Sequence, residues 1–537
     1  MAQSASAGAS SPRGPRIPLA SLPPELVRAL AYASAIGAEF PFDLLRHAMG
    51  ADEESLAEHL EELVRLGFLR ERAGGGRFAF VEEEDRGAVY RSMTESRLRV
   101  LHRKIAESLE RGNPDPSDAV IAELGRHYFL GKVFEKSYTF NRRAADAARM
   151  AHQPAIATHH LERALIDLDN LGEGRGAERA EIAETLGDLA FSMGSFQAAD
   201  RHYRIALAAV EHEQPRIRAR LLLARAEVAR ESLEAEAAIE GAREALRLFQ
   251  SDPDPYGEAQ AYRILGRVAF QRGRYRESLD ETMKALEALP PGADPTSLGR
   301  LSIDLGNTFT LLGDEVRPVA VEWYQRAVER LRAARNWAEL ARALHNLGNA
   351  VGEDRPDEGL ELLERAREAA TQAHDARAVG RSLLSGVELR IAMGQLDEAE
   401  RDNDQAGRLL EGLADALGSE QVTLNRGRIA EKRGRWEDAA QAYLTAAGLA
   451  RKLGLTADEA DAQLYLARLL FKTRDVEGAR SAFDRATDLK VTELSPRLER
   501  VYAELRELLS PSPKPEAGAA ASPHLPPGGS SSGTPAG

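Results

Sequence analysis

Apolar residues recur along most of this chain three, four and seven positions apart, which is the spacing of one face of an α-helix. From about Asp115 to Leu509 nearly every segment has this pattern, so we predict helices almost throughout that range. From Leu22 to about Gly112 the pattern is more varied. It predicts three helices and then two short runs containing Phe and Leu on either side of Ala73–Gly76, a turn signal for a β-hairpin.

Three helices followed by a hairpin is the order of elements in a winged helix. After the hairpin we expect a single long helix from Asp85 to Glu110, because the apolar residues keep helical spacing. Residues 1–21 and 511–537 are rich in Ala, Ser, Gly and Pro and have few apolar side chains to bury. We expect both segments to be disordered tails.

A second period of about forty residues overlies the helical one. Nine alanines follow one another at intervals of 39 to 42 positions: Ala164, Ala206, Ala245, Ala285, Ala327, Ala366, Ala406, Ala446 and Ala486. Most of them close a triplet at i, i+4 and i+7 on one helix face, as in Ala199, Tyr203 and Ala206. The helix before each triplet often carries a Leu-Gly pair and ends at a glycine. These closing glycines are Gly194, Gly273, Gly313, Gly394 and Gly434.

This combination of a Leu-Gly pair, a turn glycine, an aromatic residue and two alanines resembles the tetratricopeptide repeat over residues 137–493. That repeat is a helix–turn–helix of about 34 residues, so the period here is about six residues longer. We therefore predict an all-α protein. Its fold is expected to be a right-handed α-solenoid of about nine long (~40-residue) tetratricopeptide repeats, preceded by a small winged-helix domain with a β-hairpin.

The predicted organisation has five parts. They are a disordered tail (1–21), the winged helix with its connecting helix (22–113), the repeat array (114–493), a capping helix (494–510) and a second disordered tail (511–537).

Composition excludes some classes of protein. The chain has no cysteine, which excludes disulfides and thiolate metal sites. Its net charge of −14 argues against general affinity for nucleic acid or anionic membranes, because such binding needs clustered Lys and Arg. No stretch has the roughly 20 apolar residues of a membrane-spanning helix, and the first residues lack the apolar region of a secretory signal. We expect a soluble cytoplasmic protein.

Residues with catalytic or ligand-binding chemistry are few. Gly131-Lys132 lacks the first glycine and the Ser or Thr of a phosphate-binding loop, so no nucleotide site is expected there. His152, His159 and His160 lack a further ligand at metal-binding spacing and are interpreted as surface or packing residues. We expect no catalytic residue, no metal and no cofactor, and we predict that the protein is not an enzyme.

The predicted third helix of the winged helix is strongly acidic. It carries Asp52, Glu53, Glu54, Glu58, Glu61 and Glu62 against a lone Arg65. Such a face repels phosphates and argues against duplex DNA binding through this helix. A basic run in the hairpin and the following helix leaves open a contact with nucleic acid or an acidic partner, although a solvated face is the commoner meaning. Its residues are Arg70, Arg72, Arg77, Arg91, Arg97, Arg99, Arg103 and Lys104.

Residues 24 to about 170 resemble a known family of regulators. The stretch AYASAIGAEFPFDLLRHAMGADEESLAEHLEELVRLGFLRERAGGGRFAF, followed by VYRSM, LHRKIAESLE and the first repeat, is similar to the region after the nucleotide-binding domain in STAND-type signal-transduction ATPases, including relatives of the maltose-operon activator. In that family the winged helix relays the nucleotide state and the repeats sense a ligand or partner. The sequence shows no Walker motif, and Glu82 stands where the family commonly has a histidine. The resemblance therefore does not imply ATP hydrolysis.

The first helices of tetratricopeptide repeats line the concave face, where Asn, Lys and Arg hold peptide carboxylates. The position after the Leu-Gly glycine is polar or charged in every repeat and reads Asp188, Glu227, Arg267, Asn307, Asn349, Glu388, Arg428 and Arg468. We expect a protein or peptide partner to bind there. The predicted partner-binding residues are Arg267, Asn307, Asn349, Arg428 and Arg468.

These observations predict a non-enzymatic scaffold or sensor for protein–protein interaction in bacterial-type signalling. Two alternatives stay open. One is a transcriptional regulator whose winged helix contacts DNA, and the other is an accessory subunit of a separate ATPase or kinase. Neither nucleic acid nor a membrane is the expected partner.

Overall fold

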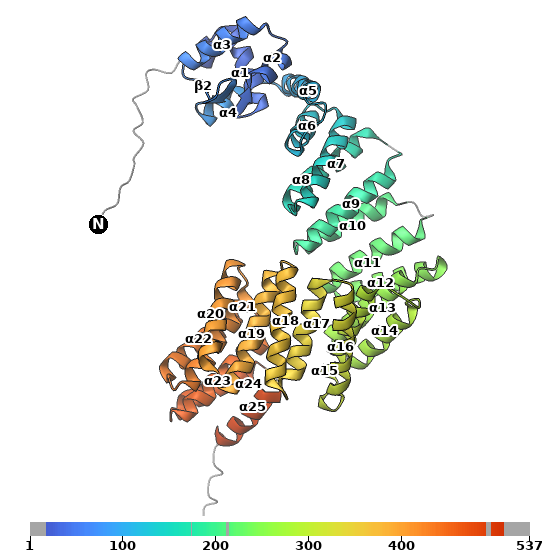
Figure 1. Cartoon of the computed structure of the whole chain (residues 1–537), viewed down its shortest axis with the longest axis vertical. Helices are drawn as coiled ribbons and strands as arrows, with labels where there is room; N and C mark the ends of the chain where they lie inside the picture. Colours follow the sequence, from blue (N-terminus) through green and yellow to red (C-terminus); the bar gives the residue numbers. More distant parts are fainter. Residues whose placement is uncertain (1–17, 173, 211–213, 490–495, 510–537) are drawn as a thin grey trace, which may run out of the picture. The chain divides into compact units, whose positions relative to one another are not determined.

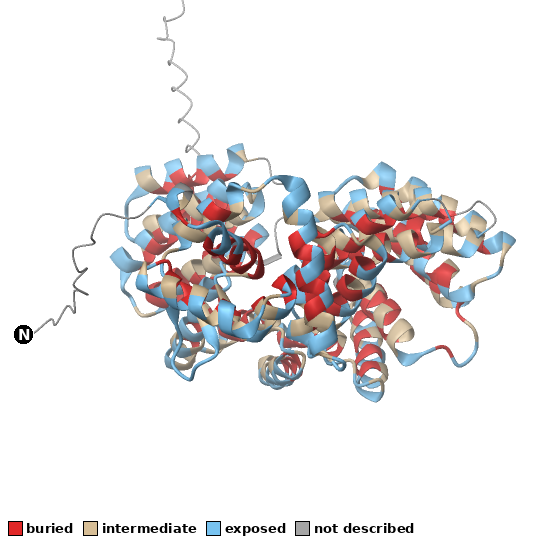
Figure 2. Cartoon of the chain, turned by 90° about the horizontal axis from the view of Figure 1, so that it is seen from above, coloured by how far each residue is buried: buried red, intermediate tan, exposed pale blue. Residues whose placement is uncertain are grey.

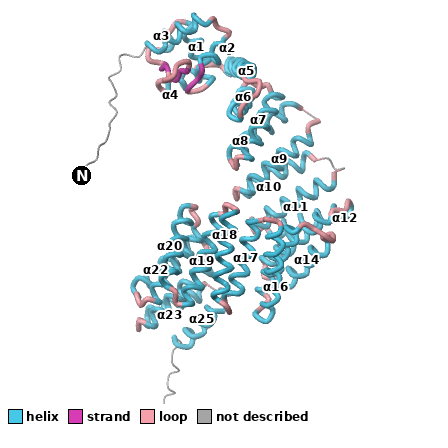
Figure 3. Tube along the Cα trace, viewed as in Figure 1, coloured by secondary structure: helices cyan, strands magenta, loops and turns pink. Residues whose placement is uncertain are grey.

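The computed structural model describes residues 18–172, 174–210, 214–489 and 496–509 (Figure 1). The two predicted tails lie outside this range, except for residues 18–21. Helices dominate the described residues, and strands occur only near the N-terminus (Figure 3). The chain divides into two compact units, unit 1 up to Pro291 and unit 2 from Gly292.

Unit 1 begins with a winged helix. Its helices and strands follow in the order α1 (Pro24–Ile36), β1 (Glu39–Pro41), α2 (Phe42–Met49), α3 (Glu53–Arg65), β2 (Leu69–Glu71) and β3 (Arg77–Phe80). The strands form an antiparallel sheet in the order β1–β3–β2. Leu30, Phe40 and Leu60 are fully buried in the core that helices and sheet share. The three helices and the hairpin are confirmed, and β1 is an addition that the sequence pattern does not predict.

The single long helix expected after the hairpin is wrong. The structure has two helices there, α4 (Glu83–Arg91) and α5 (Glu95–Gly112). Thr94 causes the break, because its hydroxyl accepts a hydrogen bond from the backbone N–H of Arg97 at 3.3 Å and so begins a new helix. The apolar spacing continues across the break and conceals it.

Helices make up the rest of each unit. Unit 1 continues with α6 (Asp118–Leu130), α7 (Phe134–Met150), α8 (Pro154–Leu171), α9 (Gly176–Ser192), α10 (Phe196–Ala209), α11 (Pro215–Glu231), α12 (Ala235–Ser251), α13 (Pro255–Gln271) and α14 (Tyr275–Ala288). Unit 2 contains α15 (Pro295–Leu311), α16 (Arg317–Ala333), α17 (Trp337–Gly352), α18 (Pro356–Gln372), α19 (Ala376–Met393), α20 (Leu396–Gly412), α21 (Ala416–Lys432), α22 (Trp436–Leu453), α23 (Thr456–Lys472), α24 (Val476–Asp488) and α25 (Pro496–Leu509).

From α7 to α24 the helices form antiparallel pairs, in which an odd-numbered A helix packs against the even-numbered B helix that follows it. The described residues contain nine such pairs, four in unit 1 and five in unit 2. Within a unit, each B helix also packs against the next A helix, and some neighbouring A helices touch. This arrangement confirms a helical-repeat solenoid of about nine repeats.

Small and large side chains are matched where the helices of a pair meet. A Cβ added to the A-helix glycine would lie 2.4 to 2.7 Å from the ring of the B-helix tyrosine in three pairs: Gly187 with Tyr203, Gly306 with Tyr324, and Gly427 with Tyr443. Where the A helix has the larger Val387 at this position, the B helix has the shorter Asn403. All nine alanines at the forty-residue interval are buried, and Figure 2 shows buried residues alternating with exposed ones along the helices.

In every pair except α17–α18, the turn between the two helices contains a residue with positive φ. All five predicted closing glycines have positive φ, from 70° to 121°. In other pairs a residue with a side chain takes this conformation, such as Leu233 (φ 61°) after α11 and Arg474 (φ 70°) after α23. The left-handed conformation therefore recurs in more of the turns than glycine does.

A capping helix is present at the end of unit 2. Helix α25 packs against α23 and α24 and buries Val501, Leu505 and Leu509 in their apolar cluster. The remaining residues of the predicted 494–510 segment lie outside the described range.

Candidate functional site

The five predicted partner-binding residues lie at one repeated position of the A helices. Arg267 is on α13 in unit 1. Asn307, Asn349, Arg428 and Arg468 are on α15, α17, α21 and α23 in unit 2. Each of them makes a contact with another side chain of its own unit.

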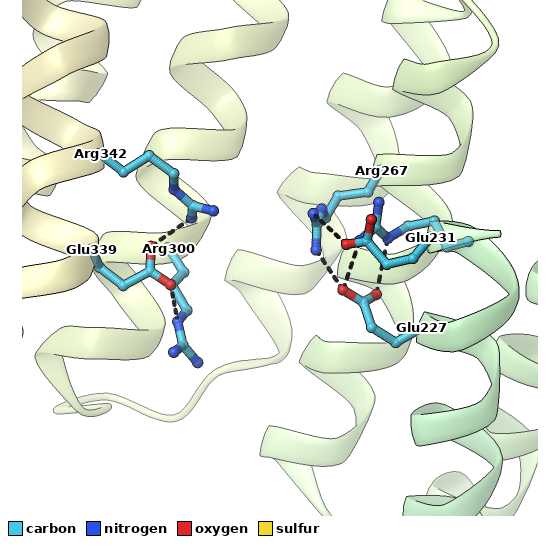
Figure 4. Close-up of polar contacts among 7 residues, drawn as sticks. Glu227, Glu231, Arg267, Arg300, Glu339 and Arg342 are labelled. Atoms are coloured by element: carbon cyan, nitrogen blue, oxygen red, sulfur yellow. Dashed lines mark hydrogen bonds and ion pairs between the residues drawn. The ribbon is translucent and has the colours of Figure 1, made fainter. Parts of the chain in front are cut away.

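Arg267 contacts two carboxylates of α11 (Figure 4). Its Nη1 donates to Glu227 Oε1 at 2.7 Å, and its Nη2 lies 4.0 Å from Glu231 Oε1. The buried Arg230 donates to both oxygens of Glu227, at 3.0 and 2.8 Å. Burial alone would raise the pKa of Glu227, but the hydrogen bond from Arg230 and the charge of Arg267 hold it below its usual value. The two arginines and two glutamates therefore neutralise one another.

A second cluster, which the sequence analysis missed, joins α15 and α17 in unit 2. Arg300 Nε donates to Glu339 Oε1 at 2.8 Å, and Arg342 Nη2 lies 2.7 Å from Glu339 Oε2 (Figure 4). The signal in the sequence is the spacing of Arg300 and Glu339, which have opposite charges and are one repeat apart.

The two predicted asparagines lie on neighbouring A helices. Asn307 Oδ1 accepts hydrogen bonds from the Tyr324 hydroxyl and from Asn346 Nδ2, both at 2.8 Å. Asn349 is exposed and lies 3.2 Å from His345 Nε2. Asn307 is thus fixed by its neighbours, whereas Asn349 stays open to solvent.

Arg428 and Arg468 lie together around Tyr465. Their guanidinium carbons are 5.7 and 5.3 Å from the centre of its ring. Arg468 donates to both oxygens of Glu431, at 3.1 and 3.0 Å. Arg428 is only 5% exposed and donates to Asn425 Oδ1 at 3.1 Å. The structure therefore places Arg428 beneath the surface and Arg468 at it.

Such contacts recur between successive A helices, and we call them inter-repeat ion pairs. In unit 1 they are Arg142–Glu181, Glu184–Arg220 and Glu227–Arg267, and in unit 2 they are Arg300–Glu339, Arg377–Asp415 and Glu431–Arg468. Each joins residues 36 to 40 positions apart in the sequence. The A helices thus present polar side chains held in place by the next repeat.

A group of carboxyl groups, also missed by the sequence analysis, lies between α21 and α23, where Glu420 is buried and Asp458 and Asp461 are half-buried. Burial raises the pKa of Glu420 to about 8, and Asp458 and Asp461 add to this effect. Burial and the charges of Asp458 and Glu388 raise the pKa of Asp461 to about 7. Glu420 is 2% exposed because it occupies a position that is Ala or Gly in the other repeats from α9 onward. Those residues are Ala180, Ala219, Ala259, Gly299, Ala341, Gly380 and Ala460.

No metal site is visible in the part of the chain that the structure describes, where no three His, Asp or Glu side chains are arranged to hold an ion. His160 is a packing residue, buried and 2.9 Å from Asn141 Oδ1. His152 and His159 are exposed. Among the described helices, none is both long and apolar enough for a membrane span.

The third helix of the winged helix, α3, is acidic. Glu54, Glu58 and Glu61 of α3 are exposed, and the lone Arg65 pairs with Glu62. Two arginines of the wing are neutralised within the domain, because Arg72 and Arg77 both donate to Glu39 of β1, at 3.1 and 2.8 Å.

A buried pair of histidines joins the winged helix to the helices that follow. His102 on α5 and His127 on α6 face each other with their Nδ1 atoms 2.9 Å apart. On the outer side of the pair, His127 Nε2 lies 3.4 Å from Glu123 Oε2 and 2.8 Å from Arg126 Nη2. His102 Nε2 forms a hydrogen bond with the Tyr90 hydroxyl at 2.9 Å.

The contacts of this histidine pair extend to α4, through Tyr90, and to α1, through Arg126. Arg126 also donates to the backbone oxygen of Ile36 at the end of α1, at 2.8 Å. Burial lowers the pKa of His102 to about 3 and lowers that of His127 as well, so both rings are neutral.

The fold and the A-helix face define a class: a helical-repeat protein of tetratricopeptide type whose array follows a winged helix. No family model and no curated protein matches the chain. Among solved structures it is similar to a STAND protein with a tetratricopeptide repeat sensor from Pyrococcus horikoshii, at 14% identity and a TM-score of 0.43. The match covers 86% of this chain and 66% of that protein.

Two other solved structures are similar over most of their own length. Aspartyl phosphate phosphatase F from Bacillus subtilis is 13% identical, with a TM-score of 0.44, over 71% of this chain and 96% of that one. The quorum sensor NprR from B. thuringiensis is 13% identical, with a TM-score of 0.41, over 58% of this chain and 99% of that one. These similarities concern the fold alone.

Proposed function

We propose that this chain is a non-enzymatic scaffold or sensor of cytoplasmic signalling, which binds a protein or peptide partner on the A-helix face of its repeats. Arg267, Asn307, Asn349 and Arg468 are the residues proposed to contact the partner. Arg428 is proposed to support this face from beneath, through Tyr465.

The observation that carries the proposal is the series of inter-repeat ion pairs. They hold polar side chains of the A helices in fixed positions, so a partner that binds these side chains immobilises little further. Asn349 is exposed and Arg468 is partly exposed, which leaves hydrogen-bonding groups open to an incoming chain. Helical-repeat arrays commonly use such extended surfaces for binding.

Site-specific photo-cross-linking tests the proposal. A photoreactive amino acid replaces Asn349 on the A helix α17 or, as a matched control, the exposed Glu361 on the neighbouring B helix α18. In cells that express the protein, position 349 is expected to yield a discrete cross-linked product that position 361 does not. Equal products at both positions, or a product at 361 alone, would exclude the A-helix face.

The two alternatives predict different partners. If the cross-linked product contains an ATPase or kinase, the chain is an accessory subunit of that enzyme, which is a narrower form of the same proposal. A DNA-binding regulator is disfavoured by the exposed carboxylates of α3. A mobility-shift assay of the full chain at about 50 mM salt checks this, since non-specific DNA contacts are strongest at low salt.

A further inference from the structure

Helix α5 exposes a basic face that no other part of the described protein covers. Arg97, Arg103 and Lys104 are exposed on it, and Val100 between them is 42% exposed. No hydrogen bond or ion pair to a described residue engages these three charged side chains. They contrast with Arg72 and Arg77 of the wing, which both pair with Glu39, in a chain whose net charge is −14.

A groove of opposite character lies elsewhere on the winged helix, between α2, α3 and the hairpin. Its volume is about 530 Å³. Phe42, Phe78, Ala57 and Val64 supply apolar lining, and Val64 is 36% exposed. The charged residues around it are mainly acidic: Asp43, Glu61 and Glu71, with Arg65 as the one cation in the lining.

The acidic residues extend from the groove along α3. Glu54, Glu58 and Glu61 are exposed at i, i+4 and i+7, and none of them has an ion-pair partner among the described residues. On α5, Arg97, Val100 and Lys104 lie at i, i+3 and i+7. Both stripes span seven residues, which is about 10 Å of helix. The two faces thus match in length, in charge and in having a valine beside the charged residues.

The two faces belong to different sides of one small domain. Helix α1 packs against both α3 and α5. In Figure 1, α3 and α5 are drawn at opposite ends of the winged helix, with α1 and α2 between them. A chain therefore presents the acidic groove and the basic stripe to two different neighbours.

We propose that the basic stripe of α5 docks into the acidic groove beside α3 of a second copy of this chain. Val100 enters the apolar groove, and Arg97, Arg103 and Lys104 contact the carboxylates along α3 and around the groove. Because the two faces differ, the contact is head-to-tail and leaves one face of each kind free to bind a further copy. The winged helix is then a self-association module.

Sedimentation velocity of the full chain tests the proposal, over a protein concentration range of about 1 to 200 µM. The average mass is expected to rise with concentration at about 50 mM salt and much less at about 500 mM, since salt screens contacts between exposed charges. A chain that stays monomeric throughout at low salt would overturn the proposal.

Charge reversal identifies the two faces. Glu58→Lys with Glu61→Lys, and separately Arg97→Glu with Lys104→Glu, are each expected to weaken association about tenfold or more. An equimolar mixture of the two variants is expected to associate again, because the native α5 of the first meets the native α3 of the second. Failure of the mixture to associate would overturn the pairing of these faces.

A matched control variant and a measurement of DNA binding complete the test. Glu361→Lys with Glu368→Lys makes the same charge change on exposed residues of α18 and is expected to associate like the unaltered protein. Circular dichroism checks that all variants are folded. If Arg97→Glu with Lys104→Glu abolishes binding of a DNA duplex while self-association persists, the stripe binds nucleic acid and the proposal is wrong.

Discussion

At the scale of single residues, the helix pairs depend on the combined size of two side chains at each crossing. Glycine on one helix leaves room for tyrosine on the other, and valine is opposite asparagine. The buried alanines beside them let the helices approach closely. This part of the core was predictable, because residues of fixed size recur at a fixed interval along the chain.

Gly427→Ala is expected to lower the free energy of unfolding by about 1 to 3 kcal/mol. The new Cβ would lie 2.7 Å from the ring of Tyr443 and 3.2 Å from the Cβ of Ala442. Gly448→Ala on α22 is the control, since nothing lies within 4 Å of its added Cβ. Alanine is the better helix former there by about 0.5 to 1 kcal/mol. Urea denaturation compares the two variants, and equal effects would contradict this account.

Glu420 makes a pH-dependent contribution to the stability of the folded protein, and only the structure reveals it. Its pKa of about 8 exceeds the ordinary value of 4.5, so the folded protein binds this proton more tightly than the unfolded chain does. The resulting stabilisation is full below about pH 4.5 and is lost as the pH rises to about 8.

Glu420→Gln is expected to remove this dependence. Between pH 5 and 8 the unaltered protein should lose more unfolding free energy than the variant, by up to about 1.4 kcal/mol per pH unit. Denaturation curves at several pH values measure the difference. Glu361→Gln, at an exposed position, is the control and should follow the unaltered protein. Parallel pH profiles for Glu420→Gln and the unaltered protein would rule out the raised pKa.

At the scale of elements, local patterns predicted the helices well and the contacts between distant segments poorly. Strand β1 has three residues and is defined by its pairing with β3, nearly forty positions later. The break before α5 depends on one capping hydroxyl, that of Thr94. The repeated polar position was also predictable, but its partners were not, because the pairing of Arg300 with Glu339 depends on how neighbouring A helices stack.

The contact of Tyr90, His102 and His127, which joins α4, α5 and α6, can be tested by substitution. His102→Phe keeps an aromatic ring but removes the hydrogen-bond partner of His127 Nδ1 and of the Tyr90 hydroxyl. A buried polar group without a partner costs about 1 to 3 kcal/mol, so the variant is expected to be less stable by that amount. Thermal and urea denaturation at pH 7.5 measure it, with His159→Phe on the exposed face of α8 as control.

The stability of the His102→Phe variant should also depend less on acid pH than that of the unaltered protein. The pKa of His102 is about 3 in the folded protein and 6.5 ordinarily, so its contribution to stability is present above pH 6.5 and is lost as the pH falls toward 3. A smaller loss of stability below pH 6.5 is therefore expected for His102→Phe. An unchanged acid profile would contradict the lowered pKa of His102.

At the scale of the whole molecule, the chain consists of two compact units that meet in sequence between Pro291 and Gly292. A protease site inserted there is expected to yield two fragments that both remain helical after cleavage, because each unit has its own buried clusters. Circular dichroism and size-exclusion chromatography of the separated fragments measure this. Loss of helix in either fragment would show that the units depend on each other to fold.

The inter-repeat ion pairs also affect how the number of repeats in such a protein can change during evolution. Arg142 on α7 pairs with Glu181 on α9, and Glu184 one turn later pairs with Arg220 on α11. Removing the α9–α10 repeat would set Arg142 beside Arg220, with no carboxylate between them. A gene rearrangement that drops this repeat would therefore place like charges side by side. These pairs match the α9–α10 repeat to both of its neighbours, so another repeat could not simply replace it.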